Sequence, residues 1–298
     1  MARKTAKDFH PEVLKLFDQY VHGTIGRRDF LKSAAQYAAV GASASLILDA
    51  LSPQFASAQQ VATDDKRLHT EYVQFPSPLG YGTVRAYLAS PAGHQGKHKL
   101  PTVLVVHENR GLNPHIEDIA RRLALADFIA LAPDALFPLG GYPGNEDAAR
   151  ELFPILDQDK THQDFLAAVD YLKTLPAGRN KVGVVGFCYG GGIANFIATR
   201  VPDLAAAVPF YGAQPTAEEA ARIKAPLLLH YAGADDRVNA GWPAYEQELK
   251  AAGVHYQAYI YPGVQHGFNN DTTPRYDEAA AKLAWQRTIE FFNQHLRA

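Results

Sequence analysis

The sequence has few residues of several kinds, and each shortage excludes a class of protein. One cysteine among 298 residues rules out an intramolecular disulfide, so the core must hold the fold together. Twenty-nine basic and 31 acidic residues give a net charge of −2, which offers no electrostatic basis for binding nucleic acid or an anionic membrane. The weakly apolar stretch at residues 34–51 is too short and too rich in Ser, Gly and Ala for a stable membrane span. What remains is typical of a globular protein, with 47% hydrophobic and 20% charged residues.

The single cysteine stands in a motif that carries chemistry. The motif is Gly186-Phe187-Cys188-Tyr189-Gly190-Gly191-Gly192, between an apolar run at 181–185 and a helical pattern at 193–198. The order strand, G-x-C-x-G, helix is typical of a nucleophile elbow with cysteine in the place of serine. Glycines two residues before and after the nucleophile relieve crowding at the sharp turn. A helix that begins here also points its positive end at the sulfur and favours the thiolate. The alternative is a buried structural cysteine beside a glycine-rich turn.

From about Val61 onward, short apolar strands alternate with helical patterns. Near-continuous apolar strands separated by helices predict a mostly parallel sheet covered on both faces. Residues 61–298 therefore form a single α/β-hydrolase-like body that starts with an antiparallel hairpin around the loop 76–82. The predicted strands are 68–75, 83–89, 102–107, 128–132, 181–185, 204–210, 227–230 and 255–261. The predicted helices are 116–126, 148–156, 162–175, 244–252 and 279–296.

Residues 1–60 differ from this pattern and contain an amphipathic helix pattern at 5–22. Arg27-Arg28, the weakly apolar run that follows, and Ala56-Ser57-Ala58 resemble a twin-arginine (Tat) export signal. We therefore expect a protein that is exported to the periplasm or beyond. The long N-terminal region and the charge of Asp49 within the apolar run favour the alternative, a helical segment that stays docked on a cytoplasmic enzyme. The amphipathic segment also leaves open a homodimer.

A thiol nucleophile needs a base, and the base needs an acid that orients it. In α/β hydrolases the chain order is nucleophile, acid, base, each at the carboxyl end of a strand. The first acids after the strand at 227–230 are Asp235 and Asp236, which spacing alone does not separate. The first histidine after the next strand is His266, for which a surface histidine is the alternative.

The segment His107-Glu108-Asn109-Arg110 follows the strand that leads into the oxyanion loop. Backbone N–H groups of Asn109 and Tyr189 are the expected oxyanion hole. Glu108 is positioned to accept a hydrogen bond from the thiol. Arg110 either pairs with Glu108 or receives an anionic substrate. No histidine stands three residues after Glu108, so we expect no zinc site, and nothing in the sequence indicates a cofactor.

Together these motifs resemble the dienelactone hydrolase family of α/β hydrolases over roughly residues 61–298. The resemblance implies Cys188 as nucleophile, His266 as general base and acid, and Asp235 rather than Asp236 as orienter, because Val238 follows it by three residues. It also implies that Glu108 holds a neutral thiol until substrate displaces it. Asn109 and Tyr189 inherit the oxyanion role.

The sequence departs from the chloroaromatic-pathway members of that family where they bind a lactone carboxylate. Pro138 and Asn270 stand where those enzymes carry arginines, which makes dienelactone itself a doubtful substrate. An aromatic cap at 136–145 is expected instead, with Tyr142 and Trp242 among the candidate pocket residues beside Phe137, Tyr189 and Tyr211. The predicted function is hydrolysis of small carboxylic esters or lactones through a thioester. The alternative is a non-catalytic or redox-sensing protein on a hydrolase scaffold.

Overall fold

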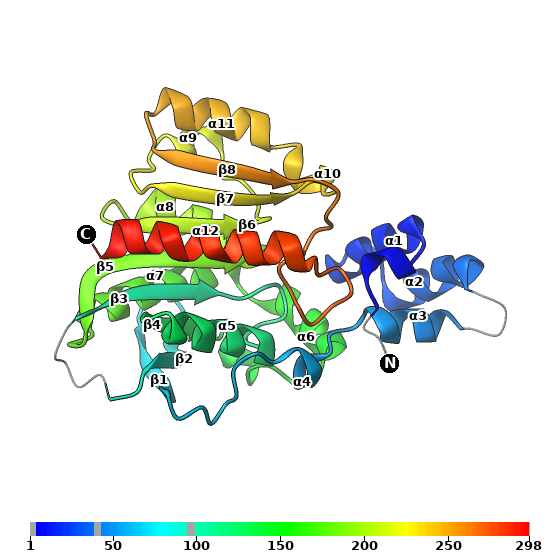
Figure 1. The fold of residues 1–298 in the computed structure, drawn as a ribbon, viewed down its shortest axis with the longest axis horizontal. Coiled ribbons are helices and arrows are strands. Elements are labelled where there is room, and N and C mark those ends of the chain that lie inside the picture. The colour runs from blue at the N-terminus through cyan, green and yellow to red at the C-terminus, as the bar shows by residue number, and fades with distance from the viewer. Residues whose placement is uncertain (1–3, 39–42, 94–98, 298) are drawn as a thin grey trace.

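The computed structural model describes residues 4–38, 43–93 and 99–297 (Figure 1). Within these residues, eight strands form one sheet in the order β1-β2-β4-β3-β5-β6-β7-β8. The pairs β1–β2 and β2–β4 are antiparallel, and the remaining neighbours are parallel, which confirms the predicted sheet and its N-terminal hairpin. The strands are β1 Leu68–Ser77, β2 Gly82–Pro91, β3 Leu100–Val106, β4 Ile129–Pro133, β5 Gly178–Phe187, β6 Ala206–Phe210, β7 Leu227–Ala232 and β8 Tyr256–Tyr261.

Helices cover both faces of this sheet, as the apolar strands require. The helices of the described chain are α1 Pro11–Val21, α2 Arg27–Ala34, α3 Ala44–Leu51, α4 Phe55–Ala58, α5 Pro114–Leu125, α6 Glu146–Leu152, α7 Gln158–Thr174, α8 Tyr189–Arg200, α9 Ala217–Ala220, α10 Asp236–Asn239, α11 Trp242–Ala251 and α12 Glu278–Leu296. Short 3₁₀ helices lie at Ala6–Asp8, Ala35–Tyr37, Phe137–Leu139 and Phe153–Ile155.

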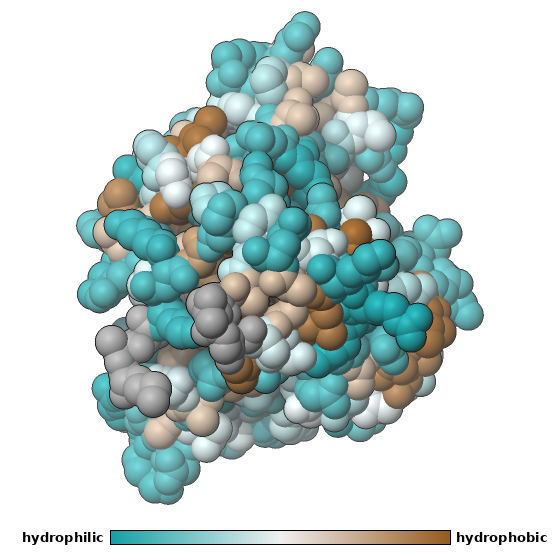
Figure 2. Space-filling view, turned by 90° about the vertical axis from the view of Figure 1, so that its right-hand side faces the viewer, coloured by the Kyte–Doolittle hydropathy of each residue, from teal (hydrophilic) through white to brown (hydrophobic). Residues whose placement is uncertain are grey.

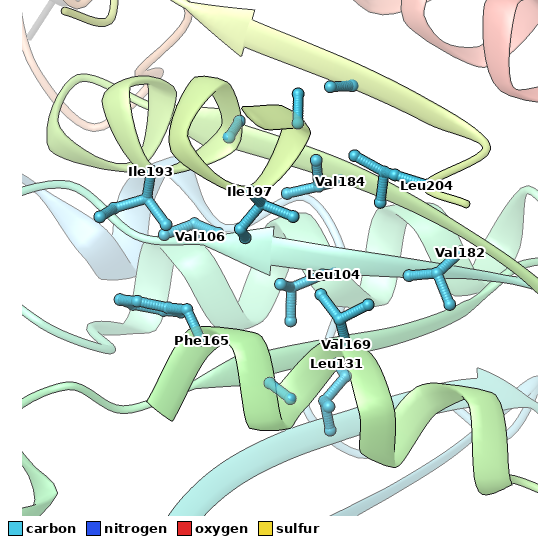
Figure 3. Close-up of a cluster of buried hydrophobic side chains, with 14 of the residues drawn as sticks. Leu104, Val106, Leu131, Phe165, Val169, Val182, Val184, Ile193, Ile197 and Leu204 are labelled. Atoms are coloured by element: carbon cyan, nitrogen blue, oxygen red, sulfur yellow. The ribbon is translucent and has the colours of Figure 1, made fainter. Parts of the chain in front are cut away.

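Two buried apolar clusters lie on opposite faces of the sheet. One contains side chains from α7, α8 and α11, and the other contains side chains from α5 and α12. Figure 3 shows part of the first cluster, where Phe165 and Val169 of α7 face Leu104 of the central strand β3. Ile193 and Ile197 of α8 complete this contact. Since α8 begins directly after the elbow, this packing fixes the helix that carries the motif.

Three short helices were missed by the sequence patterns. Each of α4, α9 and α10 has four residues, too few to show a helical period. The predicted helix at 5–22 begins only at Pro11, because proline is favoured at the first helical position and His10 caps the helix end.

The N-terminal helices α1, α2 and α3 form a small apolar cluster of their own, around Phe17, Phe30 and Leu51. They lie beyond the carboxyl ends of the parallel strands (Figure 1). Figure 2 views this side of the molecule, whose surface is mostly hydrophilic. Arg27 and Arg28 are the first two residues of α2, and residues 39–42 of the weakly apolar run lie outside the described residues.

Candidate active site

Cys188 lies at the turn between β5 and α8, in a strained conformation with φ of 55° and ψ of −112°. The flanking glycines are required by close backbone contacts. A Cβ on Gly186 would lie 1.8 Å from the carbonyl oxygen of Gly190, and one on Gly190 would lie 2.2 Å from that of Val106. The turn is also held by a hydrogen bond of 3.1 Å from the Cys188 N–H to the Phe210 carbonyl oxygen. The geometry is that of the predicted elbow.

His266 and Asp235 lie on the loops after β8 and β7 and form a buried pair. His266 Nδ1 is 2.5 Å from Asp235 Oδ2. Asp235 also caps α10, because its Oδ1 accepts a hydrogen bond from the Val238 N–H at 3.3 Å. Asp236 is the exposed first residue of α10, so the geometry selects Asp235 as the partner of His266.

Charge determines the protonation of this pair. Burial would raise the pKa of Asp235, but the hydrogen bond and charge of His266 lower it. Burial would lower the pKa of His266, but the Cys188 thiolate and Asp235 raise it. His266 Nε2 has no hydrogen-bond partner among the described residues and is buried, so this nitrogen is available to a reacting group.

A second histidine, His22, reaches the sulfur from the end of α1. Its Nε2 lies 3.4 Å from Cys188 Sγ, and its ring meets that of His266 edge to face at 4.7 Å between centroids. The sequence patterns gave no signal for His22, because 166 residues separate it from Cys188 and only the docking of α1 brings them together.

The two histidines change the expected state of the thiol. Burial would raise the pKa of Cys188, but His266 and His22 outweigh it and lower that pKa to about 6. Glu108 was expected to hold a neutral thiol, yet its Oε2 accepts a hydrogen bond of 2.8 Å from Asn270 Nδ2. The lowered pKa favours a thiolate over the guarded neutral thiol that the family resemblance implies, and the guarding role of Glu108 stays a prediction.

The oxyanion candidates line the pocket that opens onto the sulfur. Tyr189 is the first residue of α8, where a main-chain N–H has no helical acceptor. Asn109 lines the same pocket as Cys188, and its side chain donates a 2.8 Å hydrogen bond to the Val21 carbonyl oxygen.

The remaining candidate residues contact Glu146, the end of α1 or the core. Arg110 is buried and donates a 2.8 Å hydrogen bond to the Val21 carbonyl oxygen, with Glu146 at 3.8 Å. Tyr142 donates to Glu146 at 3.0 Å, and Trp242 packs against Tyr231. Two pockets, one large and one small, reach Cys188, and neither Tyr142 nor Trp242 is among the described residues that line them.

A large pocket of about 1030 Å³ opens onto Cys188. Its lining beyond the catalytic loops is mixed. The apolar side chains are Leu79, Phe153, Tyr189, Ile193, Phe196, Tyr211, Ala213 and Pro215, and the charged ones include Asp157, Asp159, Lys160, Arg200 and Glu219. A small second pocket of about 50 Å³ lies between the N-terminal helices and the sulfur, and Glu108 lines it.

Cys188, His22 and His266 are also the one cluster within the described chain whose nitrogen and sulfur atoms lie close enough for a metal ion, all within 4.8 Å. The guanidinium of Arg237, 3.1 Å from His22 Nε2, opposes a cation there, and we assign no metal to the cluster.

Among the described residues, no helix is long and apolar enough to cross a membrane.

Comparisons with known proteins match two parts of the chain. A model of the dienelactone hydrolase family matches residues 84–296, and a model described as YqhI-like matches residues 1–39. The chain is 33% identical over 252 residues to a protein of Escherichia coli (strain K12) named "Putative carboxymethylenebutenolidase", covering 79% of this chain and 90% of that one.

Two solved structures share the fold. One, titled "Putative Dienelactone Hydrolase" from Klebsiella pneumoniae subsp. pneumoniae, is similar with a TM-score of 0.65 and 28% identity, over 76% of this chain and 99% of that chain. The other is a dienelactone hydrolase-like promiscuous phosphotriesterase from metagenomic libraries, with a TM-score of 0.65 and 27% identity over 77% and 99% of the two chains. The matched family segment contains Cys188, Asp235 and His266, whereas His22 lies in the segment matched by the second model.

Proposed function

Because this chain belongs to the dienelactone hydrolase family of α/β hydrolases, we propose that it hydrolyses carboxylic esters or lactones with Cys188 as the nucleophile. One observation carries the proposal. The sulfur at the elbow and the His266–Asp235 pair converge at the carboxyl ends of β5, β7 and β8, and Cys188 and His266 line one large pocket. The relative from Escherichia coli bears the name of an enzyme that acts on a lactone, which supports the same class of substrate.

In the proposed first half-reaction, the Cys188 thiolate attacks the carbonyl carbon and a carbon–sulfur bond forms. Backbone N–H groups of Tyr189 and Asn109 stabilise the oxyanion. The carbon–oxygen bond to the alcohol then breaks, and protonated His266 donates its Nε2 proton to the leaving oxygen. Asp235 holds His266 in the tautomer that exposes Nε2.

In the second half-reaction, a water molecule attacks the thioester. His266 takes the proton of that water, the carbon–sulfur bond breaks, and the acid product leaves. The thiolate and the imidazolium are then restored, so one ester and one water have become one acid and one alcohol.

The substrate is expected to be a small neutral ester or lactone. Aromatic and aliphatic side chains line part of the pocket beyond the sulfur, which suits an apolar acyl or aryl group, and charged side chains of both signs, such as Lys160 and Glu219, line the rest. Asn270 is buried, carries no charge, and is engaged with Glu108. We therefore expect neutral aryl esters to be hydrolysed faster than lactones that bear a carboxylate.

A panel of esters tests the proposal directly. The panel includes short aryl esters, neutral lactones and carboxylate-bearing lactones, each assayed with the wild type and with Cys188→Ala. Loss of the nucleophile is expected to reduce kcat by at least a thousandfold on every substrate that the wild type turns over. Equal turnover in the two proteins would show that another group is the nucleophile.

For the N-terminal segment we propose retention, rather than export and cleavage after Ala58. Phe30, next to the twin arginines, is wholly buried in the N-terminal cluster, and Arg27 pairs with Asp147 of α6. The match of residues 1–39 to a family model of their own also supports retention. N-terminal sequencing of the protein from its native host tests this: an N-terminus near residue 59 would mean that the segment is cleaved.

A further inference from the structure

The end of α1 is shaped to present His22 to the catalytic sulfur. His22 is the last residue before Gly23, whose φ of +77° turns the chain away from the helix. His22 Nδ1 lies 2.7 Å from the Asp18 carbonyl oxygen and 3.3 Å from Asp18 Oδ1, one helical turn earlier. With Nδ1 held in this way, Nε2 is the nitrogen that faces Cys188 Sγ at 3.4 Å.

Polar contacts hold this helix end on the catalytic body. The Val21 carbonyl oxygen accepts hydrogen bonds of 2.8 Å from both Asn109 and Arg110, which belong to the proposed oxyanion loop. Asp18 lies 3.5 Å from the Arg275 guanidinium, and that guanidinium stacks 5.1 Å above the Phe17 ring. A helix held at its last carbonyl and at an acidic side chain keeps His22 in a fixed place.

The result is two imidazole–carboxylate pairs on one sulfur. His266 with Asp235 comes from the sheet loops, and His22 with Asp18 comes from the N-terminal segment. Burial would lower the pKa of His22, but Asp18 and the thiolate raise it to about 10, which favours a protonated imidazole beside the sulfur. Sulfur and imidazolium then form an ion pair that opposes the cost of burying the thiolate.

Other charged groups also face this pair and affect its protonation. Arg237, half-exposed, approaches His22 Nε2 to 3.1 Å and opposes its protonation, but as a cation it also favours the thiolate. Among the described residues, the charged and titratable groups around the sulfur and His22 include Asp18, Glu108, Arg110, Glu146, Tyr189, Tyr211, Asp235, Arg237, His266 and Arg275.

We propose that His22, oriented by Asp18, is a further active-site residue that stabilises the Cys188 thiolate, so that the N-terminal segment is part of the catalytic site. The inference rests on the proposed role of Cys188 as nucleophile and adds a residue that lies outside the matched hydrolase segment. It predicts a sulfur that stays reactive well below the pH at which a free cysteine loses its proton.

The test measures how fast the full-length protein is alkylated by iodoacetamide from pH 4.5 to 9.5, with EDTA present. Since the chain has one cysteine, the mass gain reports Cys188 alone. The variants are His22→Gln, which removes the charge, and Asp18→Asn, which leaves the imidazole without its carboxylate. His69→Gln, an exposed histidine on β1, is the matched control. Circular dichroism and thermal unfolding establish that each variant is folded.

The wild type is expected to reach half its maximal alkylation rate near pH 6. Removing a cation in contact with the thiolate should raise that midpoint by roughly one unit in His22→Gln, and by less in Asp18→Asn. At pH 6 the His22→Gln protein would then react several-fold more slowly, while His69→Gln matches the wild type. An unchanged midpoint in either folded variant would overturn the proposal.

The same experiment separates this inference from the proposed function. Alkylation needs no ester, so a shifted midpoint in a protein without esterase activity would leave His22 beside the thiolate and reject hydrolysis. Where the wild type does hydrolyse esters, the acid limb of kcat/KM should move with the alkylation midpoint. A purely structural role for His22 would reduce activity at all pH values and leave the limb in place.

Discussion

Replacement of Asp235 by Asn removes the anion that faces His266. The two groups are 2.5 Å apart and both are buried, so the protonated imidazole would lose a short charge-assisted hydrogen bond and its counter-ion. Breaking one side of a buried ion pair costs about 3–5 kcal/mol. If that cost falls on the imidazolium that donates to the leaving group, kcat/KM should fall by about a hundredfold to a few thousandfold.

The assay follows release of p-nitrophenol from a short aryl ester at pH 7.5. Asp236→Asn is the matched control, since this neighbour is exposed at the start of α10, and among the described residues it is Asp235 that pairs with His266. The control should retain wild-type activity. A loss below tenfold in Asp235→Asn, or equal losses in the two variants, would refute the assignment of Asp235 as the orienting acid.

Two further predictions concern the stability of the fold. Gly190→Ala should lower the melting temperature by several degrees or prevent folding, because the new Cβ would lie 2.2 Å from the Val106 carbonyl oxygen. The control Gly192→Ala should fold normally, because the nearest atom to its Cβ lies at 3.6 Å. Equal melting temperatures of the two variants would contradict the elbow geometry. Burial would raise the pKa of Asp271, but His115 and Arg122 lower it to about 2, below its value in the unfolded chain. The ionised carboxylate therefore contributes about 2 kcal/mol to the free energy of unfolding above pH 4, and this contribution is lost as the pH falls toward 2. Urea titrations of the wild type and Asp271→Asn should therefore differ at pH 7 and converge near pH 2, and a constant difference would refute this account.

Much of the fold could be predicted because the parallel strands are buried on both faces. Apart from Thr102, strand β3 consists of apolar residues without alternation, and such runs between helical patterns specify this architecture. The elbow was equally predictable from its motif, since Gly186 is needed by a contact with the Gly190 carbonyl oxygen only four residues away, although Gly190 itself is needed by a contact with Val106 of β3. A constraint between residues so close in the chain can be predicted from a single segment of sequence.

Long-range placements could not be predicted in the same way. His22 reaches Cys188 only because α1 packs in its own apolar cluster and then docks on the loops beside the sulfur. Trp242 was a candidate for the substrate pocket because it is aromatic and near the acid loop, yet it packs against Tyr231 and Tyr245. A side chain at the edge of an element can turn toward the site or the core, and packing decides between the two.

The central claim is that Cys188 carries the acyl group during turnover. Its most direct test is to mix the protein with excess p-nitrophenyl acetate, quench in acid within milliseconds to seconds, and measure the intact mass. We expect the mass of the wild type to increase by one acetyl group, which peptide analysis maps to Cys188, and the mass of Cys188→Ala to stay unchanged. Hydrolysis with an acetyl group on another residue, or with Cys188→Ala as active as the wild type, would contradict it.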